Sequence, residues 1–220
     1  MTARYPVLLR LAGERCLVVG GGPVAERKVR GLLAVDALVT VLAPHATEAL
    51  AALASERSVL WEHRSYAMGD AGNPDAADGA WAWRFVVAAT DDPALNRRVV
   101  ADATTVGTWA NDATADDGGP ASLPAIHREG PVTLAVATGG AHPGAATWLR
   151  DRVAAEIAPE HVVALELVDE LRRDLGVSGV TAPRPDWRQV LDSGMLDLIR
   201  EGHLAEAKER LQACLSSSSD

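Results

Sequence analysis

Basic side chains are too few here to give the chain a positive balance. It carries 21 lysine and arginine residues against 30 aspartate and glutamate residues, and its formal net charge is −9. Affinity for nucleic acids rests largely on clustered lysine and arginine side chains. The composition therefore argues against a nucleic-acid partner.

Long apolar runs are also missing. No segment approaches the ~18 apolar residues that a membrane-spanning helix needs. The apolar stretch near the N-terminus is too short for a signal peptide with a small-residue cleavage site. We therefore expect a cytoplasmic protein with no membrane partner.

Cysteine is scarce as well. Cys16 and Cys214 lie at opposite ends of the sequence, and Cys16 belongs to an apolar run in which a small buried residue is expected. We expect neither a disulfide nor a reactive thiol. Cysteine and histidine do not cluster with metal-ligand spacing, so the sequence predicts no permanent metal site.

What the chain does contain is enough apolar material for a sizeable core: 48% of its 220 residues are hydrophobic. Strand-like and helix-like segments alternate through the first half, with strands expected over 15–19, 38–42, 59–63, 84–88 and 108–111 and helices over 24–34, 47–55 and 93–106. This alternation predicts an α/β fold with a doubly wound, mostly parallel sheet covered by helices.

The second half has a different pattern. Residues 64–83 are rich in Gly, Pro, Asp and Ala and predict a surface excursion, and residues 112–120 predict a junction. Residues 131–138 then predict one apolar strand outside the alternation, whose edge a monomer would expose, so we expect a homodimer. Helical spacing follows from about Gly144, with a break near Gly202.

A glycine turn stands between the first expected strand and helix. Gly20-Gly21-Gly22-Pro23-Val24-Ala25 fits the G-x-G-x-x-A form of the dinucleotide-binding fingerprint. Gly20 would allow the tight turn, Gly22 the approach of a pyrophosphate, and Ala25 the packing of helix against strand. The alternative is that the turn is glycine-rich for structural reasons alone.

Two further strand ends are candidates for the same site. The second strand ends in Leu42-Ala43-Pro44-His45, with no carboxylate for a ribose and no arginine for a 2′-phosphate, which leaves NAD and NADP open. Thr90 and Asp91 follow another strand, although Thr90 or Asp92 could simply cap the next helix. The predicted cofactor-binding residues are Gly20, Gly21, Gly22, Pro23, Val24, Ala43, Pro44, Thr90 and Asp91.

These motifs carry a family resemblance. With VVGGGPVAERKV, VAATDDPALN and TGG-x-x-P together, the chain resembles the siroheme synthase N-terminal family of precorrin-2 dehydrogenases and sirohydrochlorin ferrochelatases. The resemblance implies an oxidoreductase of siroheme and porphyrin biosynthesis that oxidises precorrin-2 to sirohydrochlorin with NAD. In some members of the family a second reaction follows, in which Fe²⁺ is inserted into sirohydrochlorin. That reaction is a lyase reaction, and Fe²⁺ is one of its substrates. The resemblance also implies a Rossmann domain over 1–112, a dimerisation segment over 113–145 and a helical domain over 146–220.

One position departs from the family pattern. The family has an aspartate three residues after an asparagine, and counting from Asn111 puts Thr114 there. A threonine is neither a carboxylate base nor an anionic ligand, so iron insertion is in doubt. Asp112, Asp116 or Asp117 could substitute, or they could be solvated loop acids. The catalytic candidates are Asp116, Asp112, Thr114 and His142.

The tetrapyrrole substrate carries several carboxylates. Thr138, Gly139 and Gly140 could form an anion nest, Arg128 could pair with a carboxylate, and His142 could bind substrate or iron or transfer a proton. The alternative for His142 is an ordinary surface histidine. Two other functions stay open at this point: the same scaffold acting on another substrate, and a non-catalytic NAD-binding regulator.

Overall fold

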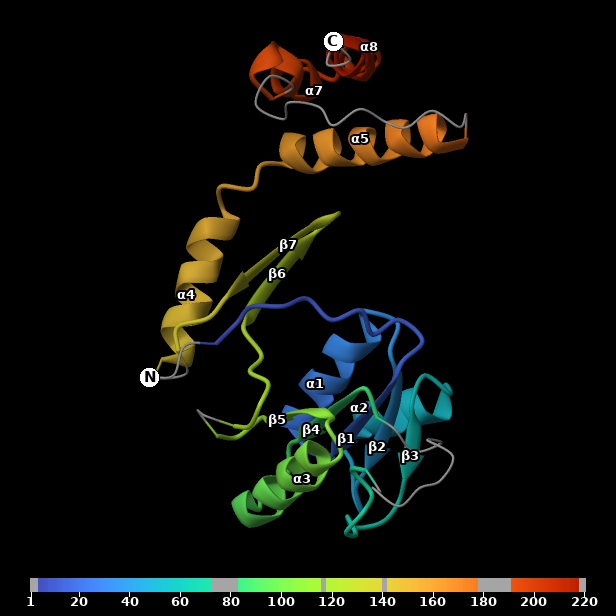
Figure 1. Cartoon of the computed structure of the whole chain (residues 1–220), viewed down its shortest axis with the longest axis vertical. Coiled ribbons are helices and arrows are strands. Elements are labelled where there is room, and N and C mark those ends of the chain that lie inside the picture. Colours follow the sequence, from blue (N-terminus) through green and yellow to red (C-terminus); the bar gives the residue numbers. More distant parts are fainter. Residues whose placement is uncertain (1–3, 73–82, 116–117, 140–141, 178–190, 218–220) are drawn as a thin grey trace. The chain divides into compact units, whose positions relative to one another are not determined.

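The chain forms two compact units in this computed structural model, which describes all residues except 1–3, 73–82, 116–117, 140–141, 178–190 and 218–220 (Figure 1). The first unit comprises Met1–Leu123 with Gly139–Ala141, and the second comprises Pro124–Thr138 with His142–Asp220. The three-part division expected from the sequence includes a dimerisation role that a single chain does not test, and it stays a prediction.

The first unit is built on a five-stranded parallel sheet of order β3-β2-β1-β4-β5 (Figure 1). Helices α1 and α2 contribute to the core on one face, and α3 contributes to the core on the other. The elements are β1 (Arg15–Val19), α1 (Pro23–Leu33), β2 (Leu38–Leu42), α2 (Glu48–Ser55), β3 (Leu60–Glu62), β4 (Phe85–Ala88), α3 (Pro93–Thr105) and β5 (Trp109–Asp112). The predicted α/β class is confirmed.

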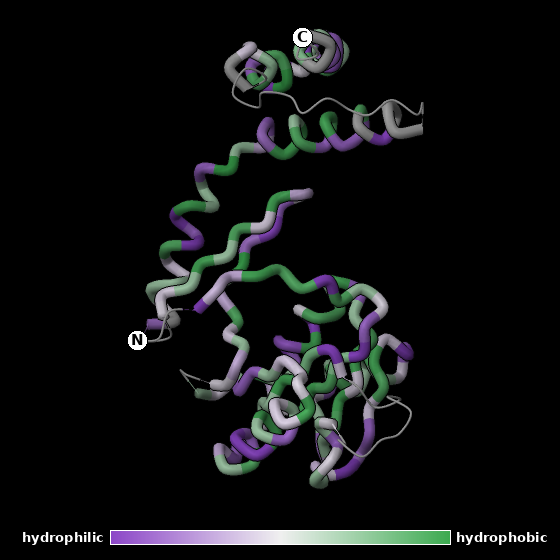
Figure 2. The backbone as a smooth tube through the Cα atoms, in the orientation of Figure 1, coloured by the Kyte–Doolittle hydropathy of each residue, from purple (hydrophilic) through white to green (hydrophobic). Residues whose placement is uncertain are grey.

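The central strand β1 shows why this sequence forms a sheet covered on both faces. Cys16 and Val18 point into the core under α1 and α2, whereas Leu17 and Val19 point into the core under α3. All four side chains are at most 1% exposed. The strand is therefore apolar at each of these positions instead of alternating apolar and polar residues, which is typical of strands covered on both faces (Figure 2). Crossovers on both faces of the sheet place the carboxyl ends of the strands together at one edge.

The excursion after β3 is anchored at its described ends rather than lying wholly on the surface. Ala71 and Trp83 are buried in the core under α3. The Trp83 indole donates a hydrogen bond to the Asp70 carbonyl at 2.7 Å, and Arg64 forms an ion pair with the Asp70 carboxylate at 2.7 Å. The middle of the excursion lies outside the described residues.

The second unit contains an antiparallel ribbon of β6 (Ala125–Glu129) and β7 (Val132–Val136), and α4 (Pro143–Ala154) packs against both strands (Figure 1). Only β7 was predicted. Side chains alternate along each strand: Ile126, Arg128, Thr133 and Ala135 share the exposed face, and their neighbours are half-buried.

The described residues of the second unit beyond α4 are mainly helical, as predicted. It consists of α5 (Pro159–Val177), a kinked segment η1 (Leu191–Met195), α7 (Leu196–Arg200) and α8 (Leu204–Ser217). Ala164, Leu167, Met195, Ile199 and Leu211 form its core. None of the described helices is both long and apolar enough to cross a lipid bilayer.

Candidate functional site

The glycine turn is enclosed by the ends of two neighbouring strands. Gly20 has φ +125° and donates its N–H to the Leu42 carbonyl at 3.0 Å. A Cβ atom at Gly20 would lie 2.3 Å from the Ala89 carbonyl oxygen, and one at Gly21 would lie 1.9 Å from the His45 carbonyl oxygen. Side chains are therefore excluded at both positions by main-chain atoms that cannot move independently.

Gly22 stands in different surroundings. It is the N-cap of α1, with φ −81° and ψ −177°, and a Cβ atom there would meet nothing within 4 Å. Within the described part of the chain, the N–H groups of Gly22, Val24 and Ala25 donate no hydrogen bond, and Pro23 has no N–H to offer. Open space in front of unused N–H groups at a helix N-terminus is the arrangement that binds a phosphate.

The loop between β2 and α2 closes against this turn. Thr47 donates its N–H to the Gly21 carbonyl at 2.9 Å, and its hydroxyl donates to Glu26 Oε2 at 2.8 Å. Hydrogen bonds from Arg30 and from Thr47 hold the pKa of the Glu26 carboxyl below its ordinary value. Ala43 is buried at the start of this loop, and Pro44 is exposed beside it.

The turn between β4 and α3 carries the second polar cluster. The Asp92 carboxylate caps α3 by accepting from the N–H groups of Ala94 at 2.8 Å and Leu95 at 3.2 Å. Asp92 therefore caps α3, which is the structural alternative that the sequence left open. Thr90 is half-buried behind it, and Asp91 is exposed.

A chain of hydrogen bonds runs from this turn to the end of β5. The Asn96 side chain, 0% exposed, bonds to Thr90 and donates from Nδ2 to Thr114 Oγ1 at 3.0 Å. The Thr114 hydroxyl donates to Asp112 Oδ1 at 2.7 Å, and the Thr114 N–H donates to the same oxygen at 2.9 Å. The carboxylate of Asp112, a residue only 5% exposed, is thus oriented by Thr114.

Asn111 precedes this carboxylate on β5. Its Nδ2 donates to the Ala121 carbonyl at 3.0 Å, and its Oδ1 is buried without a hydrogen-bond partner among the described residues. Asn111 thus anchors Ala121, which follows the loop after Asp112. The Asn111 Oδ1 atom is an acceptor that remains unused beside the end of β5 among the described residues.

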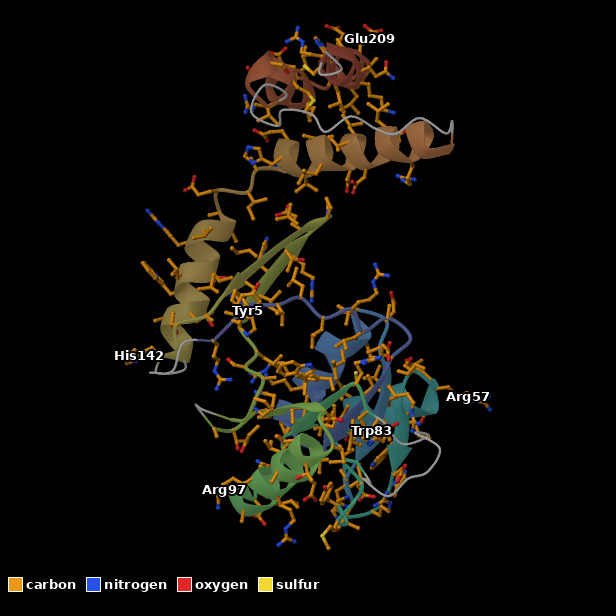
Figure 3. All side chains as sticks on the ribbon, viewed as in Figure 1. Tyr5, Arg57, Trp83, Arg97, His142 and Glu209 are labelled. Atoms are coloured by element: carbon orange, nitrogen blue, oxygen red, sulfur yellow. The ribbon has the colours of Figure 1, made fainter. Side chains whose placement is uncertain are left out.

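Two of the candidate substrate residues, Thr138 and His142, lie just before the start of α4. His142 is the exposed N-cap of α4 and makes no side-chain cap, and the Thr138 hydroxyl donates to the His142 carbonyl at 3.2 Å (Figure 3). Arg128 is exposed on β6, and Gly139 has φ +70°. Asp116, Asp117 and Gly140 lie outside the described residues.

Comparison with known proteins decides the family. A family model described as "Putative NAD(P)-binding" matches residues 7–125, which include the glycine turn and the strand ends around it. The chain belongs to this NAD(P)-binding family. The prediction of a nicotinamide dinucleotide as cofactor is confirmed, as is the Rossmann-like fold.

Relatives of this NAD(P)-binding chain share a name. It is 34% identical over 210 residues to "Siroheme synthase" of Chromobacterium violaceum, covering 94% of this chain and 43% of that protein. It is 35% identical over 224 residues to "Siroheme synthase" of Gluconacetobacter diazotrophicus, covering 97% of this chain and 45% of that protein. The chain therefore spans less than half the length of these relatives.

A solved structure matches over nearly the whole chain. "SirC, precorrin-2 dehydrogenase" superposes with a TM-score of 0.72 at 25% identity, covering 96% of this chain and 98% of that one. The resemblance to the siroheme synthase N-terminal family is thereby confirmed.

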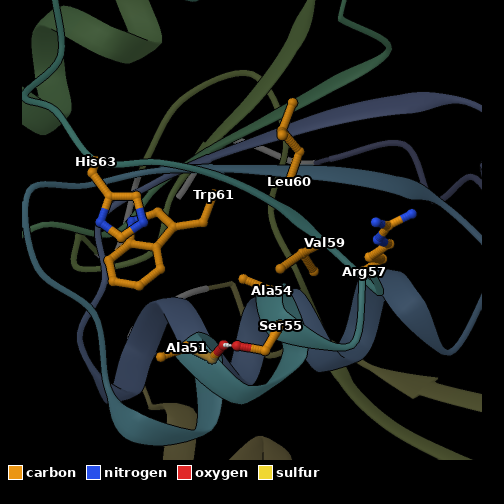
Figure 4. A pocket seen from close by; sticks show the side chains of 8 residues that line it. All are labelled: Ala51, Ala54, Ser55, Arg57, Val59, Leu60, Trp61 and His63. Atoms are coloured by element: carbon orange, nitrogen blue, oxygen red, sulfur yellow. Dashed lines mark hydrogen bonds between the residues drawn. The ribbon is translucent and has the colours of Figure 1, made fainter.

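A separate groove of about 550 Å³ lies at the edge strand of the NAD(P)-binding domain, between α2 and β3 (Figure 4). The Trp61 and His63 rings stack there with centroids 3.6 Å apart, and the Trp61 indole donates to the Ala43 carbonyl at 2.9 Å. None of the predicted site residues lines this groove. Across the described ranges, no three His, Cys, Asp or Glu side chains are grouped so as to hold a metal ion.

Sequence reasoning missed one residue of the site, Asn96. It is buried with Val99 and Ala103 on one side of α3. A polar residue at a position where helical spacing calls for an apolar one is a signal that was present in the sequence.

Proposed function

We propose that this chain is an NAD-dependent dehydrogenase that oxidises precorrin-2 to sirohydrochlorin. The observation that carries the proposal is the match to a precorrin-2 dehydrogenase over nearly the whole chain, together with an open phosphate-binding turn. The siroheme synthase relatives support the same substrate class.

The main chain of the glycine turn would hold the dinucleotide. The N–H groups of Gly22, Val24 and Ala25 and the N-terminus of α1 favour a pyrophosphate, and the space at Gly22 admits it. Ala43 and Pro44 would contact the ribose. Because the segment from Leu42 to His45 offers a 2′-phosphate no arginine or lysine, we favour NAD over NADP.

Oxidation of the substrate removes a hydride and a proton. The bound dinucleotide supplies the hydride acceptor. The protein then has to accept the proton, and among the described candidates Asp112 is best placed, because its carboxylate lies at the carboxyl end of β5 with fixed orientation. Asp116 and His142 stay candidates for the same role, with Thr114 orienting the carboxylate.

The carboxylates of the substrate need donor groups, and the candidates are the ones that the sequence predicted. Arg128 offers a guanidinium that matches a carboxylate, and Thr138, Gly139 and Gly140 would add hydroxyl and main-chain donors. His142, which is exposed, would hydrogen-bond the substrate. The proposal ends at sirohydrochlorin, because the Thr114 hydroxyl is occupied by Asn96 and Asp112 and supplies no carboxylate for iron insertion.

The homodimer belongs to the same proposal. The ribbon exposes Ile126, which is 37% exposed, and α4 exposes Trp148 and Val153, which are 67% and 41% exposed. Exposed apolar side chains on one small ribbon-and-helix element favour burial against a second copy. Ile126→Glu or Trp148→Glu should shift the sedimentation coefficient from dimer to monomer, and a wild-type monomer at micromolar concentration would contradict the dimer.

An absorbance assay tests the reaction. Purified protein with precorrin-2 and NAD should give sirohydrochlorin and an equivalent amount of NADH, and omission of NAD should abolish product. Calorimetric binding of NAD without turnover of precorrin-2 would overturn the proposal. The chain would then be a dinucleotide-binding protein with another role.

A further inference from the structure

Asn96 is an amide placed where the core of the first unit would accept an apolar side chain. It is 0% exposed and lies one helical turn after the α3 cap Asp92. A buried amide without partners would destabilise the fold, and Asn96 avoids this because both of its polar atoms are hydrogen-bonded. The pattern of those bonds determines which way each hydrogen points.

The Thr90 backbone fixes the orientation of the Asn96 amide. A backbone N–H can only donate, so the amide atom 3.1 Å from the Thr90 nitrogen must be the oxygen, Oδ1. The nitrogen Nδ2 then donates one hydrogen to the Thr90 carbonyl at 3.1 Å. Its second hydrogen points at Thr114 Oγ1, 3.0 Å away.

This orientation determines the direction of the next hydrogen bond. The Thr114 hydroxyl has a single proton and already accepts a bond from Asn96, so its proton goes to Asp112 Oδ1 at 2.7 Å. Asn96 therefore sets the direction in which Thr114 donates. The β4–α3 turn and the carboxylate at the end of β5 are joined by hydrogen bonds of one fixed polarity.

We infer that Asn96 is a positioning residue that couples the Thr90 turn, at the dinucleotide site, to the Asp112 carboxylate through Thr114. The part of the inference that concerns Asp112 rests on the proposed function. The Asn96–Thr90 part concerns dinucleotide binding alone and does not depend on the substrate.

Asn96→Asp is the informative substitution, because it keeps the shape of the side chain and the acceptor for the Thr90 N–H. It replaces the two donated hydrogens by a carboxylate oxygen, which faces the Thr90 carbonyl and the Thr114 hydroxyl. The hydroxyl proton is then drawn to the new carboxylate and away from Asp112. Thr114→Val removes the same proton without disturbing Thr90, and Thr114→Ser keeps it.

The experiment measures NAD affinity by calorimetry, and kcat and KM with precorrin-2. Thr114→Val should lower kcat about tenfold with NAD affinity unchanged, because one hydrogen bond to a charged group is lost. Thr114→Ser should restore most of that loss. Asn96→Asp should lower kcat and also weaken NAD binding about tenfold, and adding Thr114→Val to it should lower kcat no further. Thr104→Val, which removes a hydroxyl bonded only to the Val100 carbonyl in α3, is the matched control.

Three outcomes would overturn the inference. They are failure of Thr114→Ser to restore kcat, losses that multiply in the double variant, and wild-type NAD affinity in a folded Asn96→Asp protein. If wild-type protein does not oxidise precorrin-2, the proposed function fails, whereas the calorimetric comparison still decides the role of Asn96. If Asn96→Asp does not fold, the comparison of Thr114→Val with Thr114→Ser decides the coupling to Asp112.

Discussion

The Thr47 hydroxyl donates to Glu26 Oε2 at 2.8 Å and also accepts the Leu50 N–H at 3.3 Å. One side chain thereby caps α2 and links it to the first turn of α1. Glu26 accepts a second bond from Arg30 at 2.9 Å. The helices on one face of the sheet are thus connected at the edge where the glycine turn lies.

This link makes stability depend on pH in a defined direction. The pKa of Glu26 is lowered from 4.5 in the folded protein, so its contribution is present above that pH and is lost as the pH falls through the folded-state pKa. Glu26→Gln should lower the urea midpoint at neutral pH, and the gap to wild type should close as the pH falls through the lowered pKa of Glu26. Glu48→Gln, at an exposed acid without an ion pair in the described part of the chain, is the control. A gap that stays constant with pH would contradict the assignment.

Gly21 and Gly22 should respond differently to substitution. Gly21→Ala should destabilise the fold by about 1–3 kcal/mol, because the new methyl group meets the His45 carbonyl. Gly22→Asp should leave the melting temperature nearly unchanged, since open space surrounds that position. It should nevertheless weaken NAD binding by about a hundredfold or more, because a carboxylate would stand against the pyrophosphate.

Gly22→Ala is the matched control for the charge, and it should cost much less affinity than Gly22→Asp. Calorimetry with NAD and thermal unfolding separate the two effects. Unchanged NAD affinity in Gly22→Asp would remove the turn from the binding site.

Thr114→Asp tests the missing family carboxylate. It should raise the rate of cobalt insertion into sirohydrochlorin, because a carboxylate can remove pyrrole protons or steer the ion. It should also lower precorrin-2 oxidation, because the hydroxyl that donates to Asp112 is replaced by a second negative charge. NAD affinity should not change. Thr114→Asn, similar in size and uncharged, should not raise insertion, and equal insertion rates in both variants would refute the charge argument.

Cys16 should be inert in the folded protein. It is 0% exposed, and burial raises the pKa of its thiol to about 11. Iodoacetamide at mildly alkaline pH should therefore leave Cys16 unlabelled in native protein and label it after denaturation, as mass spectrometry of the peptides would show. Rapid native labelling of Cys16 would mean that the central strand opens readily.

Strands of the parallel sheet were predictable because their residues are apolar on both faces. The expected spans 15–19 and 38–42 agree with β1 and β2, and the helix expected from 93 begins at Pro93. The helix expected from 24 begins one residue earlier, at Pro23, because proline is favoured in the first turn. The expected span 59–63 is longer than β3 (Leu60–Glu62), because none of the three β3 residues is fully buried and the apolar pattern does not mark the limits of the strand.

Strand β6 could not be read from its own composition. Ala125–Glu129 has one β-branched residue and two charged ones, and it is extended because it pairs with β7. The available signal was the turn: Gly130 and Pro131 connect the pair, and Gly130 has φ +51°. Similarly, the sequence placed Thr114 and Asp112 close together, but only the fold shows that Asn96 determines how they bond.

The backbone construction of the glycine turn has a consequence for how this chain can change. Its proposed phosphate-binding groups are peptide N–H groups, and two of its glycines are fixed by carbonyls of Ala89 and His45. Substitutions elsewhere can therefore alter coenzyme preference without rebuilding the anion site. Pro44 and His45, at the end of β2, are the positions to change first, because both are exposed and follow the strand end at which we propose that the ribose binds.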